Sequence, residues 1–405
     1  MDKGNARPMR LVHLADIHLG FRQYQRQTPT GINQREKDVA DSLRRVIDKV
    51  IELKPDLVLI AGDVFHAVRP GNPAILHAFN EFSRLVRELP SESRIVMIAG
   101  NHDTPRASET GSILGLFRTL GITVVEGAER PISVPEHDLV ILAVPDKAGG
   151  SRPVLEPDPT AKYNILVLHG EIEGILPHFG AHLERAPMAF SQKELSAHKF
   201  DYVALGHYHV YRQIDANAFY SGSLDYTSTN AWGELSEERE MEYTKGIIEH
   251  DLTNRTHRFH QIPPARRWVD LTPLSGEGLS AAALDEMIRA AIDGCDGGIE
   301  EKIVRLVVRD VPRHILRELD HKALREYKRR ALHFHLDTRR PEMVRRESGQ
   351  GAPGRRASLA DTVREKLESR PLAENIDRQS LVDLGLHYLR EADLVAGPTV
   401  EEATA

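Results

Sequence analysis

Short apolar runs that stop at metal-binding residue types are the feature that most limits how this chain can fold. Runs of this length that are rich in Val, Ile and Leu are typical of strands buried on both faces. In open α/β sheets, ligand-forming loops lie at the carboxyl ends of the strands. Five such runs occur, so the sequence predicts one site assembled from five strand ends. The residues that follow the runs are Asp16 and His18; Gly62 and Asp63; Gly100, Asn101 and His102; His169; and Gly206, His207, Tyr208 and His209.

Helix-like segments alternate with strand-like runs over residues 9–261. The stretches 36–53 and 74–89 each place apolar residues on one helical face, and each lies between two of the strand-like runs. This βαβ order predicts a sheet with helices packed against it. Because the segments after Gly121 are shorter and extended, either a mixed sheet or two sheets packed face to face, with helices outside, would accommodate both halves. These segments are 122–125, 139–144, 211–214, 219–220, 246–250 and 257–262.

Two adjacent prolines, Pro263 and Pro264, indicate a domain boundary. Beyond them, alternating strand-like and helix-like segments predict a smaller αβ domain. Its expected elements are a strand at 268–271, a helix at 280–292, a strand at 302–308, a helix at 313–329 and a strand at 332–336.

The C-terminal part has a different composition. Residues 347–356 contain three Gly, one Pro and two adjacent Arg, which is typical of a linker. Leucines then recur at helical spacing from Leu359 onward and predict two amphipathic helices, with Ser358 or Asp377 as candidate caps. These helices form either a hairpin packed on its own domain or an element that docks a partner. The predicted organisation is a large α/β domain at 9–262, a small αβ domain at 263–345, a linker at 346–357 and a helical segment at 358–396.

Composition fits an intracellular enzyme. The 405 residues suffice for two or three domains, and the 40% hydrophobic content can supply a core. The lone Cys295 cannot form an intramolecular disulfide, no charged leader with an apolar region opens the sequence, and no apolar stretch approaches the roughly 20 residues of a spanning helix. We therefore expect a cytoplasmic protein. The net charge of −7 neither supports nor excludes a nucleic-acid substrate, because a local basic patch or bound cations can supply the attraction.

The side chains at the strand ends offer carboxylate, imidazole and amide donors without a thiolate. Such mixed oxygen and nitrogen sets suit Mn²⁺, Fe or Zn²⁺. They are too many for one ion, whereas two ions roughly 3.5 to 4 Å apart that share a bridging carboxylate would use them all and could activate a water for attack on a phosphoryl group. Isolated histidines such as His77, His137, His198 and His250 are interpreted as surface or core residues. The candidate ligands are Asp16, His18, Asp63, Asn101, His169, His207 and His209.

The position of His102 predicts a separate role. It directly follows Asn101, and adjacent side chains on an extended segment point in opposite directions, so both can serve one ion only in a turn. A free imidazole that faces the leaving group could donate a proton to it or bind the phosphate. Asp103 either orients that ring or belongs to a helix start, with Thr104 as cap and Pro105 in the first turn.

These residues resemble the motifs of the calcineurin-like metallophosphoesterase superfamily. Within it, the run at 16–24 (Asp-Ile-His-Leu-Gly-Phe-Arg-Gln-Tyr) and the run at 220–224 (Tyr-Ser-Gly-Ser-Leu) look like the SbcD family, the nuclease subunit of double-strand-break repair complexes. The resemblance covers roughly residues 9–262 and is weak beyond. The motifs that carry it are Asp16 to Gly20, Gly62 to His66, Gly100 to Asp103, His169-Gly170 and Gly206 to His209.

The resemblance implies roles for single residues. Asp16, His18 and His209 would hold a first ion, Asn101, His169 and His207 a second, and Asp63 would bridge them. His102 would contact the phosphate without binding metal, and the usual cation is manganese. His66 and Asp103 would support the ligands from outside. Arg22, Arg69 and Arg106 follow ligand motifs and either grip the DNA backbone or are ordinary solvated arginines.

The resemblance also implies an architecture and partners. The expected fold is α/β, a four-layer sandwich of two mixed sheets flanked by helices, followed by a small αβ capping domain that helps to place DNA and by the C-terminal helical segment. The expected assembly is a homodimer in the cytoplasm near the nucleoid, bound to an SbcC-like ATPase with a long coiled coil through the C-terminal helices. Duplex ends, hairpins or single strands would be its DNA substrates.

Three functions are compatible with these features. The first is a Mn²⁺-dependent DNA exonuclease or endonuclease that cuts phosphodiesters with metal-activated water. The second is a phosphodiesterase for a smaller substrate, because a site for two metals does not dictate a polymer. The third is a scaffold that binds DNA ends and leaves catalysis to a partner. An open groove rimmed by basic residues favours the first, and a closed pocket favours the second.

Overall fold

The computed structural model of the chain describes residues 8–105, 111–147, 152–175, 188–341, 363–364, 366–368 and 377–396. The chain divides into two units, Met1–Pro341 and Glu342–Ala405. This division does not test the predicted domain bounds, so the boundaries at 262 and 345 stay predictions.

The first sheet of the first unit holds three of the five predicted strand ends. Its six strands run in the order β14-β13-β1-β2-β3-β4: β1 to β4 are parallel, β13 is antiparallel to β1, and β14 is antiparallel to β13. The strands are β1 (Arg10–Leu14), β2 (Leu57–Ile60), β3 (Arg94–Ile98), β4 (Thr123–Val125), β13 (Gly246–Asp251) and β14 (Thr256–Gln261).

The second sheet holds the other two strand ends, so two mixed sheets form, as the second alternative above expects. Its order is β11-β12-β10-β7-β6-β5, with the four central strands parallel and antiparallel strands at both edges. The strands are β5 (Arg130–Val134), β6 (Leu139–Val144), β7 (Tyr163–His169), β10 (Tyr202–Gly206), β11 (Arg212–Asp215) and β12 (Ala218–Tyr220).

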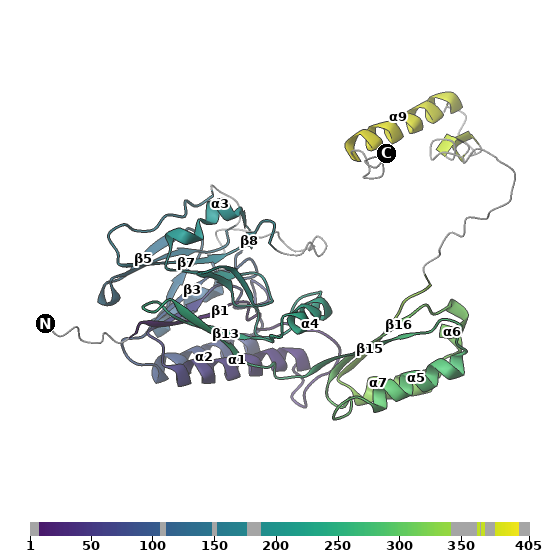
Figure 1. The fold of residues 1–405 in the computed structure, drawn as a ribbon, viewed down its shortest axis with the longest axis horizontal. Helices are drawn as coiled ribbons and strands as arrows, with labels where there is room; N and C mark the ends of the chain where they lie inside the picture. Colours follow the sequence, from purple (N-terminus) through teal and green to yellow (C-terminus); the bar gives the residue numbers. More distant parts are fainter. Residues whose placement is uncertain are drawn as a thin grey trace. The chain divides into compact units, whose positions relative to one another are not determined.

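The two sheets pack face to face between outer layers. Successive strand residues point to opposite faces: Leu11 belongs to the core between the sheets, and Val12 packs under helices α1 (Gln34–Leu53) and α2 (Asn72–Glu88). Both helices lie on the same side of β1 and β13 (Figure 1). On the outer face of the second sheet, an apolar cluster includes residues of α3 (Gln192–Leu195) and of the 3₁₀ helix η4 (Ala197–Lys199). The predicted four-layer α/β sandwich is therefore confirmed.

A smaller αβ region follows in the same unit. Strands β15 (Trp268–Ser275), β16 (Ile303–Arg309) and β17 (His333–Thr338) form a parallel sheet. Helices α5 (Ala281–Asp293), α6 (Arg313–Glu318) and α7 (His321–Arg330) lie beside it (Figure 1) and contribute residues to its apolar core. The single helix predicted at 313–329 is wrong. The chain leaves the helical conformation at Leu319, and the Asp320 carboxylate accepts hydrogen bonds from the amides of Lys322 and Ala323, which starts a new helix.

Helix α1 also contacts the start of the small region through buried charges. The Arg35 guanidinium is fully buried, donates to Asp225 Oδ1 at 2.6 Å, and lies 5.4 Å from the ring centre of Trp268. Arg266 donates to both carboxylate oxygens of Asp38, at 2.6 and 2.9 Å. The small region is therefore fixed to α1 by the ion pair between Arg266 and Asp38 and by the contact between the Arg35 guanidinium and the Trp268 ring.

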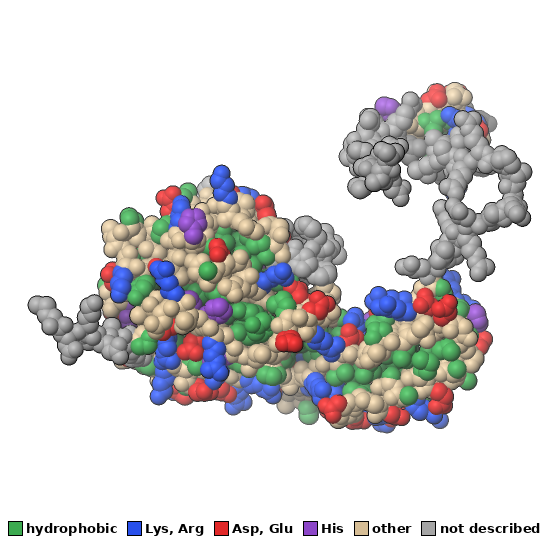
Figure 2. All heavy atoms as spheres, in the orientation of Figure 1, with side chains coloured by type: hydrophobic (Ala, Val, Ile, Leu, Met, Phe, Trp, Pro, Cys, Tyr) green, Lys and Arg blue, Asp and Glu red, His purple; other side chains and the backbone are tan. Residues whose placement is uncertain are grey.

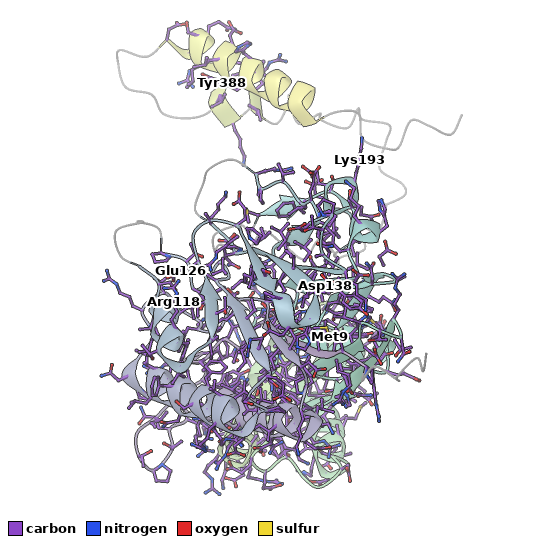
Figure 3. All side chains as sticks on the ribbon, turned by 90° about the vertical axis from the view of Figure 1, so that its left-hand side faces the viewer. Met9, Arg118, Glu126, Asp138, Lys193 and Tyr388 are labelled. Atoms are coloured by element: carbon purple, nitrogen blue, oxygen red, sulfur yellow. The ribbon has the colours of Figure 1, made fainter. Side chains whose placement is uncertain are left out.

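Several described elements have no counterpart in the predicted ones. The 3₁₀ helix η2 (Ile113–Leu120) is linked to the end of β4 by the ion pair between Arg118 and Glu126, 2.8 Å long (Figure 3). Because such elements are short or polar, their sequences carry little periodic signal. The other unpredicted elements are strand β5, the 3₁₀ helices η3 (Pro135–His137) and η4, the short strands β8 (Glu171–Ile172) and β9 (Ala189–Phe190), and helices α3 and α4 (Ala231–Glu240).

The second unit contains helix α9 (Arg378–Ala396). Its predicted cap is present, because the Asp377 carboxylate accepts a hydrogen bond from the Ser380 amide at 2.8 Å. Leu384 and Tyr388 are exposed on this helix. The linker at 346–357, Ser358 and Leu359 lie outside the described residues. Among the described helices, none combines the length and the apolar content needed to cross a membrane.

Two histidines are buried in the first unit around Tyr202. His13 donates or accepts at the Tyr202 hydroxyl over 3.1 Å, and the His250 ring lies 4.6 Å from the Tyr202 ring. Burial lowers the pKa of His13 to about 3, and burial together with His257 lowers the pKa of His250 to about 4. His250 is thus a core residue and not a ligand, in agreement with its interpretation from the sequence.

These lowered pKa values predict acid sensitivity. The unfolded chain binds a proton at His250 near pH 6.5 whereas the folded chain does not until about pH 4, so stability is present above pH 6.5 and is lost as the pH falls toward 4. In His250→Leu, the loss of unfolding free energy between pH 7.5 and 5.5 should be smaller by about 1.4 kcal/mol, measured by urea unfolding at both pH values. The exposed His198→Gln serves as control. Equal pH dependence of His250→Leu and wild type would contradict this prediction.

Candidate metal centre

The five predicted strand ends meet at one place. The Asp16 carboxylate, after β1, accepts from the amide of His207, after β10, with both oxygens 3.0 Å from that nitrogen. The Nε2 atoms of His18 and His209 lie 3.0 Å apart. Since β1 belongs to the first sheet and β10 to the second, the site is built from the carboxyl ends of both sheets.

Asp63 lies at the middle of the group. Its Oδ2 atom is 3.6 Å from Nε2 of His18 and also 3.6 Å from Nε2 of His169. Its Oδ1 atom accepts a hydrogen bond of 2.9 Å from the backbone amide of His102. His169 Nε2 is in turn 3.0 Å from Asn101 Oδ1. One carboxylate therefore lies between two sets of nitrogen and oxygen donors.

Four of the predicted ligands have a left-handed backbone. The φ angles are 52° at Asp16, 51° at His18, 52° at Asp63 and 107° at His207. Such angles are uncommon for residues other than glycine and cost of order 1–3 kcal/mol each. They persist here because the loops are held by hydrogen bonds such as those from the Asp16 amide to the Gly62 carbonyl and from the His18 amide to the Asp63 carbonyl. The unusual backbone directs these side chains into the site.

Three glycines allow the strand ends to approach one another. A Cβ atom on Gly62 would lie 2.3 Å from His169 Nδ1, and one on Gly100 would lie 2.0 Å from Asp63 Oδ1. On Gly206 it would lie 1.9 Å from the Ala61 carbonyl oxygen. These glycines, which the sequence places beside ligands, are required because any side chain would occupy space that the site uses.

Hydrogen bonds fix which ring nitrogens face the centre. His169 Nδ1 lies 2.8 Å from the Ala61 carbonyl, which only accepts, so Nδ1 carries the proton. His209 Nδ1 lies 3.3 Å from the Glu234 carboxylate, which likewise accepts. In the neutral form of each ring, Nε2 then carries a lone pair that points toward another ligand atom, Asn101 Oδ1 for His169 and His18 Nε2 for His209. Convergent lone pairs of this kind suit a bound cation.

Burial and neighbouring charges shift the pKa values of the titratable groups in the centre. Burial raises the pKa of the Asp16 carboxyl, and neighbouring imidazoles partly offset this. Burial, and then repulsion from His209 and His102, lowers the pKa of His18 well below its usual range. At His169 and His209, burial lowers the pKa but nearby carboxylates outweigh it, so both pKa values are raised. His18 is therefore neutral at physiological pH, which is the form that binds metals.

The described residues contain three groups whose donor atoms lie within 4.8 Å of one another. Their mixture of imidazole and carboxylate matches the donors that Mn²⁺, Fe and Zn²⁺ accept, so the residues fit a metal centre. Asn101 and His207 lie beside these groups, next to His169. The Nε2 atom of His169 is 3.0 Å from Asn101 Oδ1, and the ring centres of His169 and His207 are 5.6 Å apart. The groups are Asp16, His18 and His209; Asp16, Asp63 and His169; and His18, His66 and His102.

Asp103 supports the site in a way that differs from both sequence interpretations. Its buried carboxylate accepts from the backbone amides of Val64, Phe65 and Gly100, at 3.0, 2.9 and 3.1 Å, and so ties the loop after β2 to the loop after β3. Burial raises the pKa of Asp103 to about 7. Thr104 Oγ1 donates to the Gly100 carbonyl at 2.7 Å.

The His102 ring is oriented by backbone instead. Its Nδ1 atom lies 2.8 Å from the carbonyl oxygen of His66. The rings of His102 and His66 stack with their centres 5.1 Å apart, and the His18 ring lies edge-on to His102 at 4.8 Å. His66 is thus brought next to both a candidate ligand and the candidate proton donor.

The predicted DNA-contacting arginines differ in their surroundings. Arg22 is exposed but pairs with Glu36 at 2.7 Å, and Arg69 is exposed. Arg106 lies outside the described residues. Basic and acidic side chains alternate over the described surface of the first unit that Figure 2 shows. A phosphate-binding role of these arginines stays a prediction.

Sequence reasoning missed three charged residues near the centre. Asp146 follows β6 through Pro145 and is fully buried; this is the same strand-end pattern, and could have been found by it. Glu234 on α4 and Lys245 before β13 contact His209. No local motif marks these two, because they reach the centre only through the fold.

Comparison with known proteins places the chain in a family. A family model described as calcineurin-like phosphoesterase matches residues 9–211, which is half of the chain. The chain belongs to this family, as its motifs predict. The matched range contains every predicted metal ligand and His102.

Curated relatives carry a more specific name. The DNA double-strand break repair protein Mre11 of Methanocaldococcus jannaschii is 30% identical over 255 residues, 60% of this chain and 64% of that protein. The protein of the same name from Sulfurisphaera tokodaii is 32% identical over 218 residues, 51% of this chain and 50% of that protein. The chain thus spans about half to just under two thirds of the length of these relatives. Their name agrees with the resemblance to DNA repair nucleases drawn from the motifs.

The close approach at Gly206 yields a prediction. In Gly206→Ala the new methyl group would meet the Ala61 carbonyl and the His169 ring, so the free energy of unfolding should fall by about 1–3 kcal/mol and Mn²⁺ binding should weaken. Urea unfolding and calorimetric titration with Mn²⁺ measure the two effects. Gly71→Ala is the control, because its Cβ would meet only ordinary contacts at 3.5 Å. The glycine requirement is wrong if both variants bind Mn²⁺ like the wild type.

Proposed function

We propose that this chain is a Mn²⁺-dependent nuclease that hydrolyses phosphodiester bonds at DNA ends, as exonuclease, endonuclease or both, in double-strand-break repair or DNA processing. The observation that carries the proposal is the position of Asp63, with Oδ2 3.6 Å from both His18 Nε2 and His169 Nε2. A carboxylate between two donor sets is what a bridging ligand of two ions requires. Membership in a phosphoesterase family and the names of the relatives support the same reaction class.

The proposed ligands follow the motifs. Two Mn²⁺ ions, when bound, would supply Lewis acidity to the phosphate and lower the pKa of an attacking water. The close group formed by Asp16, His18 and His209 supports the first set of ligands. The proposed ligands are Asp16, His18 and His209 for one ion, Asn101, His169 and His207 for the other, and Asp63 for both.

His102 would contact the phosphate and protonate the leaving oxygen. Its backbone amide donates to Asp63 Oδ1 at 2.9 Å, so the residue lies beside the bridging carboxylate. Because the His66 carbonyl engages Nδ1, Nε2 is the ring atom that we assign to the phosphate. In its protonated form the ring would donate from Nε2, which is general-acid catalysis. His66 would thus act through its carbonyl, and Asp103 through the loop that carries His102.

Loss of the bridge or of the proton donor predicts loss of cleavage. With Mn²⁺ and linear duplex or hairpin DNA, Asp63→Asn should abolish cleavage, because the amide keeps the hydrogen bond from His102 but removes the negative charge. His102→Ala should reduce the cleavage rate by about 10²–10⁴-fold while Mn²⁺ still binds. Gel assays of labelled DNA give the rates, and calorimetry gives Mn²⁺ binding.

The controls separate this function from its alternatives. His198→Ala removes an exposed histidine outside the centre and should cleave like the wild type. Cleavage of bis-p-nitrophenyl phosphate without cleavage of any DNA would favour a small substrate instead. DNA affinity that survives chelation, with no cleavage by the wild type, would favour a scaffold. Full DNA cleavage by Asp63→Asn would refute the proposed centre.

We further propose that the protein acts as a homodimer with an SbcC-like coiled-coil ATPase, which binds the C-terminal helices. Exposed Leu384 and Tyr388 on α9 support a docking surface there. On α2, exposed Leu76 and Val86 offer apolar surface that a second copy of the chain could cover. DNA would contact Arg22, Arg69 and Arg106.

Removal of the tail tests the docking role. Deletion of residues 357–405 should abolish co-purification with the ATPase and leave Mn²⁺ binding unchanged. In the full chain, Leu384→Glu combined with Tyr388→Glu should have the same effect, because it places charge on the exposed apolar positions. Asp383→Asn, also exposed on α9, is the matched control. A truncated chain that still binds the ATPase would show that the docking assignment is wrong.

A further inference from the structure

We propose that Glu234 and Lys245 are positioning residues that fix His209 in the one ring state able to bind metal. The inference rests on the proposed metal centre and assigns a function to charges that the reaction itself does not use. Neither residue belongs to a recognised motif of the sequence. Both are buried, with relative exposures of 7% and 2%.

Glu234 acts on the ring of His209. Helix α4 presents its Oε1 atom 3.3 Å from His209 Nδ1. An ionised carboxylate can only accept, so Nδ1 must hold a proton, and in the neutral ring that binds metal Nε2 then holds the lone pair. That Nε2 atom lies 3.0 Å from Nε2 of His18, inside the centre. Glu234 therefore selects the tautomer that a metal at this place needs.

Lys245 connects the ring of His209 to its backbone. Its Nζ atom donates to Glu234 Oε2 at 2.6 Å and to the His209 carbonyl at 2.8 Å. It also donates to Ser223 Oγ at 3.0 Å and lies 2.9 Å from Glu238 Oε1. Because one ammonium holds both the carboxylate behind the ring and the carbonyl of the same residue, the position and the rotation of His209 are fixed together.

Stability alone does not account for the charges of this cluster. Removing ions from water costs several kcal/mol each, and buried ion pairs often stabilise no more than well-packed apolar residues would. Here the Lys245 ammonium is buried between Glu234 and Glu238, and the Glu234 carboxylate places its negative charge directly behind His209. Negative charge at this place makes Nε2 a stronger donor to a cation.

His169, on the opposite side of the centre, has no carboxylate hydrogen-bonded to its Nδ1 atom. His169 Nδ1 donates to the neutral carbonyl of Ala61 at 2.8 Å, whereas His209 Nδ1 donates to a carboxylate. The two proposed ion sites are therefore supported unequally. Changes at Glu234 should affect the ion held by Asp16, His18 and His209 more than the other ion.

Glu234→Gln tests the inference through hydrogen-bond direction. Lys245 can only donate, so it will hold the carbonyl oxygen of the new side chain and leave the NH₂ group facing His209 Nδ1. Nδ1 must then accept, which moves the ring proton to Nε2. We expect this switch in the ¹⁵N spectrum of the metal-free protein labelled at histidine, with the His209 signals assigned by their loss in His209→Gln. We also expect Mn²⁺ affinity to fall about 10–100-fold at one of two sites.

Glu237→Gln is the matched control. It removes the same charge from the same helix, but Glu237 bonds to Tyr208 and Arg212 and not to the His209 ring. It should leave the His209 proton on Nδ1 and both Mn²⁺ affinities unchanged. If wild-type His209 carries its proton on Nε2, or if Glu234→Gln alters neither the ring state nor Mn²⁺ binding, the inference is overturned. A wild-type protein with the Nδ1 proton that binds no Mn²⁺ would instead refute the proposed centre and leave the positioning of the ring intact.

Discussion

The close contact between the carboxyl edges of the two sheets is the constraint on which the rest of the site depends. Gly206 lies so near the Ala61 carbonyl that a Cβ atom would approach it to 1.9 Å. Donors from both sheets reach one another only at this spacing, and the backbone must turn left-handed at Asp16, His18 and Asp63 to direct them inward. The buried strands on either side supply the rigidity that holds these unfavourable conformations in place.

Around this contact, the candidate ligands form hydrogen bonds on the side that faces away from the centre, here called the outer side, and direct other atoms inward. The amides of the loops are taken by Asp103, and the outer nitrogens of His169 and His209 are taken by Ala61 and Glu234. The inner nitrogens are thereby left with lone pairs. The outer hydrogen bonds thus orient the inner atoms in the way that a bound cation would need, and both sets of atoms are placed by the strand ends.

Much of this arrangement could be predicted from the sequence, because it depends on local signals. Apolar runs followed by Gly and a ligand residue mark the strand ends, and helix α1 shows its apolar face directly. The division into two sheets was only one of two alternatives, since pairing between distant strands leaves no local trace. The break before Asp320 was missed because a capping carboxylate and a helical one look alike in sequence. Lys245 meets His209 across 36 residues, which no periodicity records.

Arg35 gives helix α1 a second role besides covering the first sheet. Its guanidinium is enclosed between the Asp225 carboxylate and the Trp268 ring, and Arg266 grips Asp38 one turn further along the helix. Breaking a buried pair of this type costs about 3–5 kcal/mol. A swing of the small region away from α1 would have to break the pair between Arg266 and Asp38 and the contact of Arg35 with the Trp268 ring, whereas the pair between Arg35 and Asp225 lies within the large domain and would remain. Motions that leave this joint with α1 intact avoid that cost.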